Sequence, residues 1–289
     1  MEQRRIALLV NPAAGKGRAV TIAEKVADKL RRAGIGMELY FTQWPETLNG
    51  YSDVFLIGGD GTLNYFINAY PACNLPVALF AAGSGNDFAW KLNGKQNWEE
   101  SYATAMSGEV IPVDAGICNG QYFINGVGIG FDGQVVKSMG RKKLISAGHF
   151  AYLFTVLKEI LIYQSMAVKI NRDDIYTNAK VFMISIANGS RYGGGFMVAP
   201  QAIINDGLLD LVTVNKLGLL ARLKYLPAIE KGKHLHLSFM ESTTCKSVHI
   251  ESDSIIPAHL DGELLEAASF EIHILARHFR FRVNGKPGT

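Results

Sequence analysis

Residues 53–64 read DVFLIGGDGTLN, an apolar run that leads into a glycine-rich turn. The run is typical of a buried strand, and the residues from Leu63 to Asn68 favour a helix. Glycines on both sides of Asp60 permit positive φ angles and a close approach of the backbone to a phosphate group. Asp60 itself supplies a hard oxygen ligand for Mg²⁺ or its water shell. An ordinary helix cap would also explain this aspartate, but a cap does not require the flanking glycines, so the pattern favours a phosphate site.

A second glycine turn follows the next apolar run. Residues 79–89 read LFAAGSGNDFA and place Ser84 in a polar turn after a strand. The carboxyl ends of successive parallel strands fall on one edge of a sheet, where open α/β folds bind ligands. A lone turn of this kind would be interpreted as a helix cap, but two of them at one edge predict the lip of a nucleotide site.

A third turn lies near the N-terminus, where the strand-like residues 5–10 (RIALLV) are followed by NPAAGKGR at residues 11–18. A helix is expected from about Val20 to Ala33. Backbone amides in such a small-residue turn can face an anion at the helix N-terminus. The spacing of a Walker loop is absent, and taken alone this turn fits a plain strand-to-helix connection equally well.

The chain changes character after about Pro112. Before it, strand-like and helix-like segments alternate, which predicts a parallel sheet covered by helices. After it, β-like segments are punctuated by glycine, and helices are expected only near residues 147–163 and 219–231. We therefore expect an α/β domain over residues 1–115 and a mostly antiparallel β domain over residues 116–289, whose last segment could pack back on the first domain. A ligand cleft is expected between them.

The composition excludes several classes of protein. A net charge of +3 with no concentrated basic stripe argues against a nucleic-acid partner. The three cysteines lie far apart without CxxC spacing, which favours a reducing, cytoplasmic compartment. The apolar stretch Phe150–Ile162 is shorter than the ~20 residues of a membrane-spanning helix, so no transmembrane segment is expected. That stretch suits a buried helix, and a lipid substrate would also suit it to a membrane surface.

Three motifs, NPAAGKGRA, GGDGTLN and AAGSGNDFA, occur in that order and resemble the nucleotide-side motifs of the diacylglycerol and sphingosine kinase catalytic family. The later segments NGVGIGFDGQV, NGSRYGGGFMVAPQAIINDGLLD and HLDGELL extend the resemblance over nearly the whole chain. The resemblance implies a Rossmann-like nucleotide-binding domain of the NAD kinase and diacylglycerol kinase type, followed by an antiparallel β-sandwich that holds the lipid acceptor. It also implies that ATP and Mg²⁺ are used.

The resemblance also assigns roles to individual residues. Asp261 falls on the base that accepts the lipid hydroxyl proton, and Glu263 on a residue that helps organise the nucleotide and its metal. The segment IINDGLL corresponds to a structural metal loop, with the Asp206 side chain and the carbonyls of Ile203 and Leu208 as ligands. The nucleotide-binding residues implied are Asn11, Gly15, Lys16, Thr42, Gly58, Gly59, Asp60, Gly61, Thr62, Asn64 and Ser84.

The residue types support this chemistry independently, because in-line phosphoryl transfer needs a metal, backbone amides on phosphate oxygens and a carboxylate near the acceptor hydroxyl. Plain turns would explain the DG pair at residues 261–262 and the NDG at residues 205–207 as well; the order of the motifs favours function. Two features depart from the family. Only about fifteen residues separate Thr42 from Gly58, so a helix there is short or missing, and Tyr65 stands where many relatives carry glutamate.

We therefore expect an ATP- and Mg²⁺-dependent lipid kinase that transfers the γ-phosphoryl group to a hydroxyl of diacylglycerol or a related lipid alcohol. In this scheme Asp60 orients metal-bound water and Asp261 removes the proton. The alternatives are a kinase of a soluble acceptor such as NAD and a catalytically silent nucleotide- or lipid-binding relative. A lipid substrate implies peripheral contact with the inner membrane surface, and exposed strand edges are compatible with a homodimer. Hydrolase chemistry has no support, since no G-x-S-x-G elbow is present.

Overall fold

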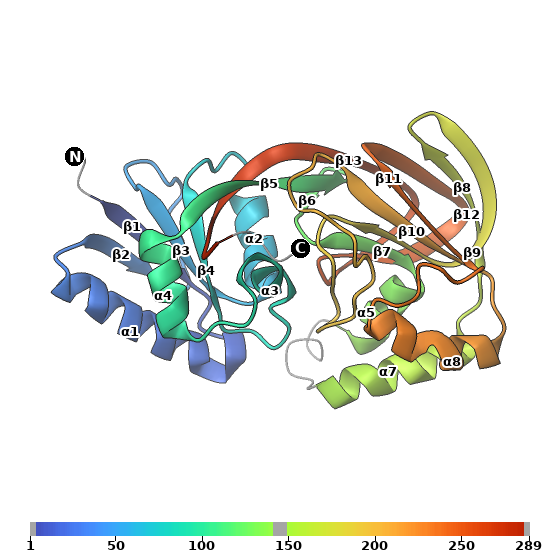
Figure 1. Cartoon of the computed structure of the whole chain (residues 1–289), viewed down its shortest axis with the longest axis horizontal. Coiled ribbons are helices and arrows are strands. Elements are labelled where there is room, and N and C mark those ends of the chain that lie inside the picture. Colours follow the sequence, from blue (N-terminus) through green and yellow to red (C-terminus); the bar gives the residue numbers. More distant parts are fainter. Residues whose placement is uncertain (1–3, 141–148, 286–289) are drawn as a thin grey trace. The chain divides into compact units, whose positions relative to one another are not determined.

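The N-terminal residues form a parallel sheet in the order β2-β1-β3-β4 (Figure 1). The structure is a computed structural model that describes residues 4–140 and 149–285. The strands of this sheet are β1 (Arg5–Val10), β2 (Gly36–Tyr40), β3 (Asp53–Gly58) and β4 (Pro76–Ala81). Its helices are α1 (Arg18–Arg32), α2 (Asp60–Ala69), α3 (Asp87–Asn93) and α4 (Trp98–Ser107). This alternation confirms the predicted α/β class.

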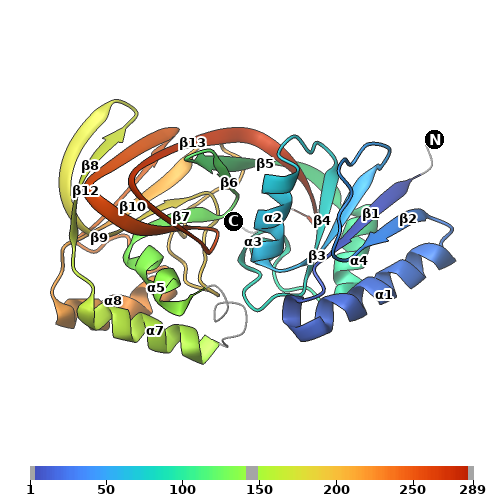
Figure 2. The same cartoon turned by 180° about the vertical axis from the view of Figure 1, so that it is seen from behind.

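Helix α1 packs on the sheet through a single apolar stripe. Its buried side chains recur at intervals of three and four residues, the spacing that places them on one helical face: Ala19, Ile22, Ala23, Val26 and Leu30. They share a core with Phe55 and Ile57 of β3 and with Ala105 of α4. Figure 2 shows α2 and α3 across the sheet from α1 and α4. Helices on both faces explain why every residue of β3 is buried.

The chain divides into two compact units. The first contains residues 1–113 and 277–289, and the second contains residues 114–276. Two strands therefore run through a boundary: β5 (Glu109–Cys118) and β13 (Glu263–Val283).

The end of β13 is anchored in the first unit, where it pairs in parallel with β4. Nη2 of Arg282 donates a hydrogen bond to Oδ1 of Asp53 at 2.6 Å, and Nη2 of Arg4 donates to the same oxygen at 2.8 Å. Burial opposes the ionisation of Asp53, but the two guanidinium groups outweigh it and lower its pKa. A buried carboxylate needs such partners, and this cluster ties the last strand to β3.

The second unit is built from antiparallel strands, which are β6 (Gln121–Phe123), β7 (Gly126–Gly130), β8 (Met166–Arg172), β9 (Ile175–Ala187), β10 (Leu209–Asn215), β11 (Met240–Cys245) and β12 (Ser247–Leu260), with the second half of β5 and most of β13. Strands β7 and β8 each pair with both β9 and β12. They do so at different ends of these two long strands. The long strands β9 and β12 therefore fold over an apolar core, and β12 bends where its register shifts between Glu251 and Ile256. This is the predicted β-sandwich.

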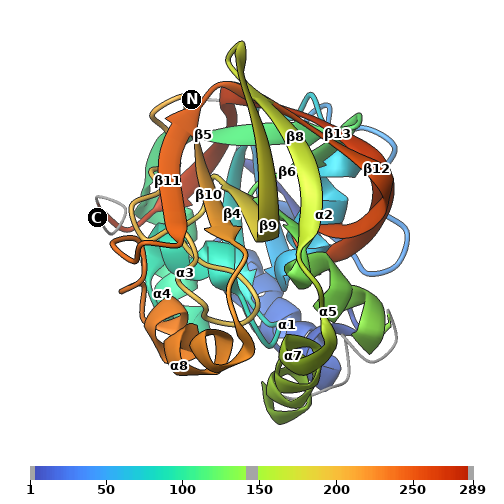
Figure 3. The same ribbon diagram turned by 90° about the vertical axis from the view of Figure 1, so that its right-hand side faces the viewer.

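Three helices cover a second core against β9 and β10 (Figure 3). They are α5 (Phe131–Met139), α7 (His149–Ile162) and α8 (Leu219–Glu230). Helices were predicted at residues 147–163 and 219–231; residues 147–148 lie outside the described residues. Helix α5 was not predicted, and residues 131–133, expected in a β segment, begin it. The reason is local: Gly130 has φ 88° and ends the strand.

Candidate functional site

The three glycine turns of the first unit meet at the carboxyl ends of β1, β3 and β4. The turns after β3 and β4 touch directly. A Cβ atom added to Gly83 would lie 2.7 Å from the Cα atom of Gly59, and one added to Gly59 would lie 2.9 Å from the Cα atom of Gly83. Asn86 closes the second turn, because the amide of Gly83 donates to its Oδ1 at 2.8 Å and its Nδ2 donates to the carbonyl of Gly83 at 2.8 Å. Only a pair of glycines allows this approach.

Side-chain hydrogen bonds join the turn after β1 to the other two. Nδ2 of Asn11 donates to Oγ1 of Thr62 at 3.0 Å, and Nη2 of Arg18 donates to the carbonyl of Gly83 at 2.7 Å. A Cβ atom added to Gly15 would lie 2.1 Å from a carbonyl oxygen of the turn after β4. The structure thus brings together the predicted residues Asn11 and Gly15 of the turn after β1, Thr62 of the turn after β3, and the backbone of the turn after β4.

Asp60 begins α2 and reaches the start of α3. Its Oδ1 accepts a hydrogen bond from the amide of Phe88 at 3.3 Å. The carboxylate therefore lies near the N-termini of two helices, where the helix dipoles favour negative charge. A hollow of about 260 Å³, open mouth included, lies against Gly58, Gly59 and Asp60. Close-packed glycine backbone beside a carboxylate fits a group that combines phosphate with a hard cation such as Mg²⁺.

The remaining predicted nucleotide residues divide into two sets. Lys16, Gly61, Asn64 and Ser84 lie in or next to the three turns. Thr42 follows β2, the outer strand of the sheet, and in the part of the chain that the structure describes no hydrogen bond joins it to the turns.

The short connection between β2 and β3 is an aromatic loop. Residues 41–52, all of which the structure describes, contain no helix. The ring of Trp44 contacts that of Tyr65 with centroids 5.1 Å apart and stacks on that of Tyr70 at 6.3 Å. Tyr65, the residue that departs from the family pattern, therefore helps to hold this loop in place. The loop occupies the segment in which a helix was expected to be short or missing.

Asp261 lies in the turn between β12 and β13 and is fixed by three amides. Its Oδ2 accepts a hydrogen bond from the amide of Ile124, and its Oδ1 accepts from the amides of Asn125 and Gly126, all at 2.9 Å. The amide of Asp261 in turn donates to the carbonyl of Gly126 at 3.0 Å. These bonds tie the turn to the start of β7 and set the direction of the carboxylate. Glu263 is the first residue of β13.

The loop that contains Asp206 is organised around a second carboxylate. Oδ1 of Asp206 accepts from the amide of Leu208 at 3.0 Å, as in an Asx turn. The amide of Gly207 donates to Oδ2 of Asp114 at 2.7 Å, and Asp114 is fully buried. Among the described residues, no group of three or more histidine, cysteine, aspartate or glutamate side chains is arranged around a common metal position. The metal predicted at Asp206, Ile203 and Leu208 therefore stays a prediction.

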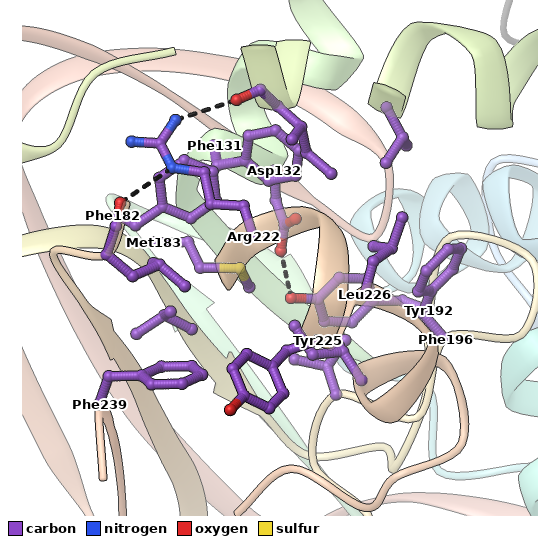
Figure 4. A pocket seen from close by; sticks show the side chains of 16 residues that line it. Phe131, Asp132, Phe182, Met183, Tyr192, Phe196, Arg222, Tyr225, Leu226 and Phe239 are labelled. Atoms are coloured by element: carbon purple, nitrogen blue, oxygen red, sulfur yellow. Dashed lines mark hydrogen bonds between the residues drawn. The ribbon is translucent and has the colours of Figure 1, made fainter. Parts of the chain in front are cut away.

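The second unit also contains an apolar pocket of about 640 Å³, open mouth included (Figure 4). It lies between α5, α7 and α8 on one side and β9 and β10 on the other. Its lining is mostly aromatic and aliphatic and includes Phe131, Ile160, Met183, Phe196, Leu226 and Phe239. A lining that is mostly hydrophobic and aromatic, with a few polar groups, is typical of sites for apolar small molecules.

One end of the pocket is polar. The hydroxyl of Tyr192 donates to Oδ2 of Asp132 at 2.5 Å, and both residues line the pocket (Figure 4). The ring of Tyr192 contacts that of His259 edge-on, with centroids 5.1 Å apart. Burial raises the pKa of Asp132 to about 6 and lowers the pKa of His259 to about 4. A Cβ atom on Gly128 would lie 2.5 Å from Nε2 of His259 and 2.8 Å from Cβ of Asp132, so glycine is needed beneath this pair.

Comparison with known proteins gives the family. A model of the diacylglycerol kinase catalytic domain matches residues 5–118. A model of the YegS C-terminal NAD kinase beta sandwich-like domain matches residues 125–281. The chain belongs to the diacylglycerol kinase catalytic family. Among its YegS-like relatives, proteins named "Probable lipid kinase YegS-like" from Yersinia pestis and Yersinia pseudotuberculosis are 30% identical over 244 residues, which cover 80% of this chain and 79% of each relative.

Solved structures agree with this diacylglycerol kinase family fold. A crystal structure of a Bacillus anthracis protein assigned as a diacylglycerol kinase has a TM-score of 0.82 and 24% identity, and covers 99% of this chain and 97% of its own. An NAD kinase from Archaeoglobus fulgidus, solved in complex with ATP, has a TM-score of 0.59 and 12% identity over 98% and 95% of the two chains. Both show that the fold is shared.

The polar end of the apolar pocket was not predicted from the sequence. Asp132 and His259 lie inside segments that were recognised, but the sequence alone did not indicate that both lie against Gly128. The glycines at 126, 128 and 130 were an available signal, because alternate glycines leave one face of a strand bare. Within residues 4–140 and 149–285, no helix has both the length and the apolar character needed to cross a bilayer.

Proposed function

We propose that this chain is a lipid kinase that uses ATP and Mg²⁺ to phosphorylate a hydroxyl of diacylglycerol or a related lipid alcohol. It would work in the cytoplasm as a peripheral protein on the inner membrane surface. Family membership and the names of the Yersinia relatives support lipid kinase chemistry. ATP as donor is supported by the packed glycine turns and by the fold shared with an NAD kinase that binds ATP.

The position of β7 is the observation that supports a lipid alcohol as the acceptor. Its first residue, Gly126, donates a hydrogen bond to the Asp261 carboxylate. Its third residue, Gly128, lies beneath Asp132 and His259 at the polar end of the pocket. One short strand therefore connects the proposed base to a pocket that can hold an apolar chain. A lipid alcohol combines these two requirements, because it has a reactive hydroxyl at one end and an acyl chain at the other.

In the proposed mechanism Asp261 takes the proton of the lipid hydroxyl. The hydroxyl oxygen forms a bond to the γ-phosphorus of ATP, the bond between that phosphorus and the bridging oxygen breaks, and ADP leaves. The three amide hydrogen bonds hold the carboxylate in one orientation, as a general base requires. Glu263, two residues further on, would help organise the nucleotide.

The nucleotide would lie along the three glycine turns, with Asn11, Gly15, Lys16, Gly58, Gly59, Gly61, Thr62, Asn64 and Ser84 as its contacts. Backbone amides of such turns can stabilise the phosphate oxygens. When bound, Mg²⁺ supplies charge neutralisation on the phosphates. Asp60 offers the carboxylate for it. Thr42 is the weakest member of the proposed set, because it lies apart from the turns.

The test is transfer of labelled γ-phosphate from ATP to detergent-dispersed lipid alcohols, with NAD as a soluble acceptor in parallel. We expect labelled lipid, and a loss of turnover of roughly 10²- to 10⁴-fold in Asp261→Asn. The matched control is Asp253→Asn, which removes an exposed carboxylate from β12, the strand that leads into the turn of Asp261. Labelled NAD without labelled lipid would show that the acceptor is a soluble molecule and not a lipid. ATP binding without any labelled product would indicate a catalytically silent relative.

A further inference from the structure

Helix α7 exposes an apolar stripe on the side that faces away from the pocket. Phe154, Leu157, Leu161 and Ile162 are exposed, with 71% of Phe154 and 61% of Ile162 accessible. Phe154, Leu157 and Leu161 follow one another at intervals of three and four residues, which places them on one helical face. Ile162 is the last residue of the helix and lies next to Leu161 in the chain. The opposite face carries Ile160, which is buried and lines the pocket. Large apolar side chains that gather in this way on a protein surface indicate an interaction site.

Helix α8 continues the apolar surface. Leu219, Leu220 and Leu223 are exposed, and 85% of Leu220 is accessible. The other side of α8 supplies lining residues of the pocket, and no residue of this helix is fully buried. Figures 1 and 3 both show α8 beside α7.

The two helices are joined by Arg222. Its Nη1 donates hydrogen bonds to the carbonyls of Ile160 at 3.0 Å and Tyr163 at 2.6 Å, at the C-terminus of α7. A cation there is favoured by the helix dipole. The guanidinium also lies over the ring of Phe182, 4.3 Å from its centroid. These bonds fix α8 beside the end of α7. The exposed apolar residues of the two helices are here called the α7–α8 face; they are Phe154, Leu157, Leu161, Ile162, Leu219, Leu220 and Leu223.

The exposed charges within the two segments that form the α7–α8 face are mostly positive. Five exposed lysines lie on or beside the two helices: Lys158, Lys216, Lys224, Lys231 and Lys233. Residues 153–163 and 216–233 contain two carboxylates. Glu159 is buried and accepts a hydrogen bond from Ser138 at 2.8 Å, so Glu230 alone is exposed in these two segments. Lys158 lies between Leu157 and Leu161 within the apolar stripe itself.

From this combination we infer that the α7–α8 face docks on the surface of an anionic phospholipid bilayer. Leucine and phenylalanine side chains enter the boundary between head groups and acyl chains, while lysines bind the lipid phosphates. A second copy of the chain is a poorer occupant, because a symmetric contact would bring the same lysines against one another. The inference rests on the proposed function: the bilayer holds the acceptor lipid, and the pocket lies directly behind both docked helices.

The experiment measures binding of the full chain to vesicles without ATP. One vesicle contains equal parts phosphatidylglycerol and phosphatidylcholine, and the other contains phosphatidylcholine alone. We expect sedimentation with the anionic vesicles, weakened by added salt. Leu161→Glu combined with Leu220→Glu should reduce binding at least about tenfold, and Lys158→Glu combined with Lys224→Glu should reduce it by more than about fivefold per lysine. The control is Tyr176→Glu, which changes a 78% exposed side chain at the start of β9.

Three outcomes would overturn the inference. They are absence of binding to the anionic vesicles, equal loss in the Tyr176→Glu control, and a dimer in solution that the α7–α8 variants dissolve. Phosphorylation of detergent-dispersed lipid is measured separately on the same variants, and we expect it to be unchanged. Vesicle binding without lipid phosphorylation would therefore reject the proposed function alone, and phosphorylation without vesicle binding would reject the docking surface alone.

Discussion

The phenol of Tyr192 donates a 2.5 Å hydrogen bond to Asp132, a carboxyl group that burial keeps at a pKa of about 6. In an unfolded chain the pKa of aspartate is about 4. Folding therefore favours the protonated form of Asp132, even with the tyrosine bond opposing this. The consequence can be measured as a dependence of stability on pH.

We predict that Asp132→Asn gains stability relative to the wild type as the pH rises from about 4 to about 6. Below about pH 4 the carboxyl group is protonated in both folded and unfolded chains. As the pH rises, the unfolded chain loses its proton first, so the wild type becomes less stable until the folded group also ionises. The asparagine variant lacks this loss, and its relative free energy of unfolding should rise by roughly 2 kcal/mol. Urea unfolding across this range measures it.

The comparison must be variant against wild type, because His259 opposes the effect. Burial lowers the pKa of His259 to about 4, so the folded protein loses stability as the pH falls from about 6.5 towards 4. In the wild type the two groups partly cancel. Tyr192→Phe is the control, since it keeps Asp132 and should keep the pH-dependent loss. A pH-independent difference between Asp132→Asn and the wild type would show that Asp132 is not desolvated.

A second prediction concerns the contact between Gly59 and Gly83. Gly83→Ala would put a methyl group 2.7 Å from the Cα of Gly59 and 2.9 Å from Oδ1 of Asn86, so the two turns must separate. We expect a stability loss of about 1–3 kcal/mol from overpacking, and a loss of ATP affinity of at least about tenfold measured by calorimetry.

The control for that substitution is Gly218→Ala, because a Cβ atom at Gly218 meets nothing within 4 Å and its φ of −71° suits alanine. It should leave both stability and ATP affinity unchanged. If Gly83→Ala bound ATP normally, the proposal that the nucleotide lies along these turns would fail.

Asp261 is expected to contribute to both stability and catalysis. Asp261→Asn keeps one acceptor oxygen for three amide donors, so at least one buried amide loses its partner, at a cost of about 1–3 kcal/mol. Thermal unfolding measures that cost. Turnover of protein that is still folded should fall by the larger factor given above. A drop in turnover no greater than the drop in folded fraction would make Asp261 a structural residue only.

The sequence was informative where the structural cause is local. The strand–glycine–helix patterns around Asp60 and Ser84 need only neighbouring residues, and the turns were found where they were predicted. The three amide hydrogen bonds to Asp261 were not predictable in that way, because their donors at residues 124–126 lie more than a hundred positions earlier in the chain. The pocket was hidden for another reason: in one dimension its aromatic lining has the same pattern as a packed core.

The last prediction decides whether the loop around Asp206 binds a metal. Hydrogen bonds hold the loop in the described structure: the amide of Leu208 donates to Asp206, and the amide of Gly207 donates to the buried Asp114. If the loop binds Mg²⁺, adding the ion at about a hundred times its dissociation constant should stabilise the wild type by about 2.7 kcal/mol. Asp206→Asn should lose this gain, and the control Asp253→Asn should keep it. Thermal unfolding without nucleotide separates this site from one at Asp60, because Asp60→Ala should retain the response. An equal response in Asp206→Asn and the wild type would leave the loop as a turn held by Asp114.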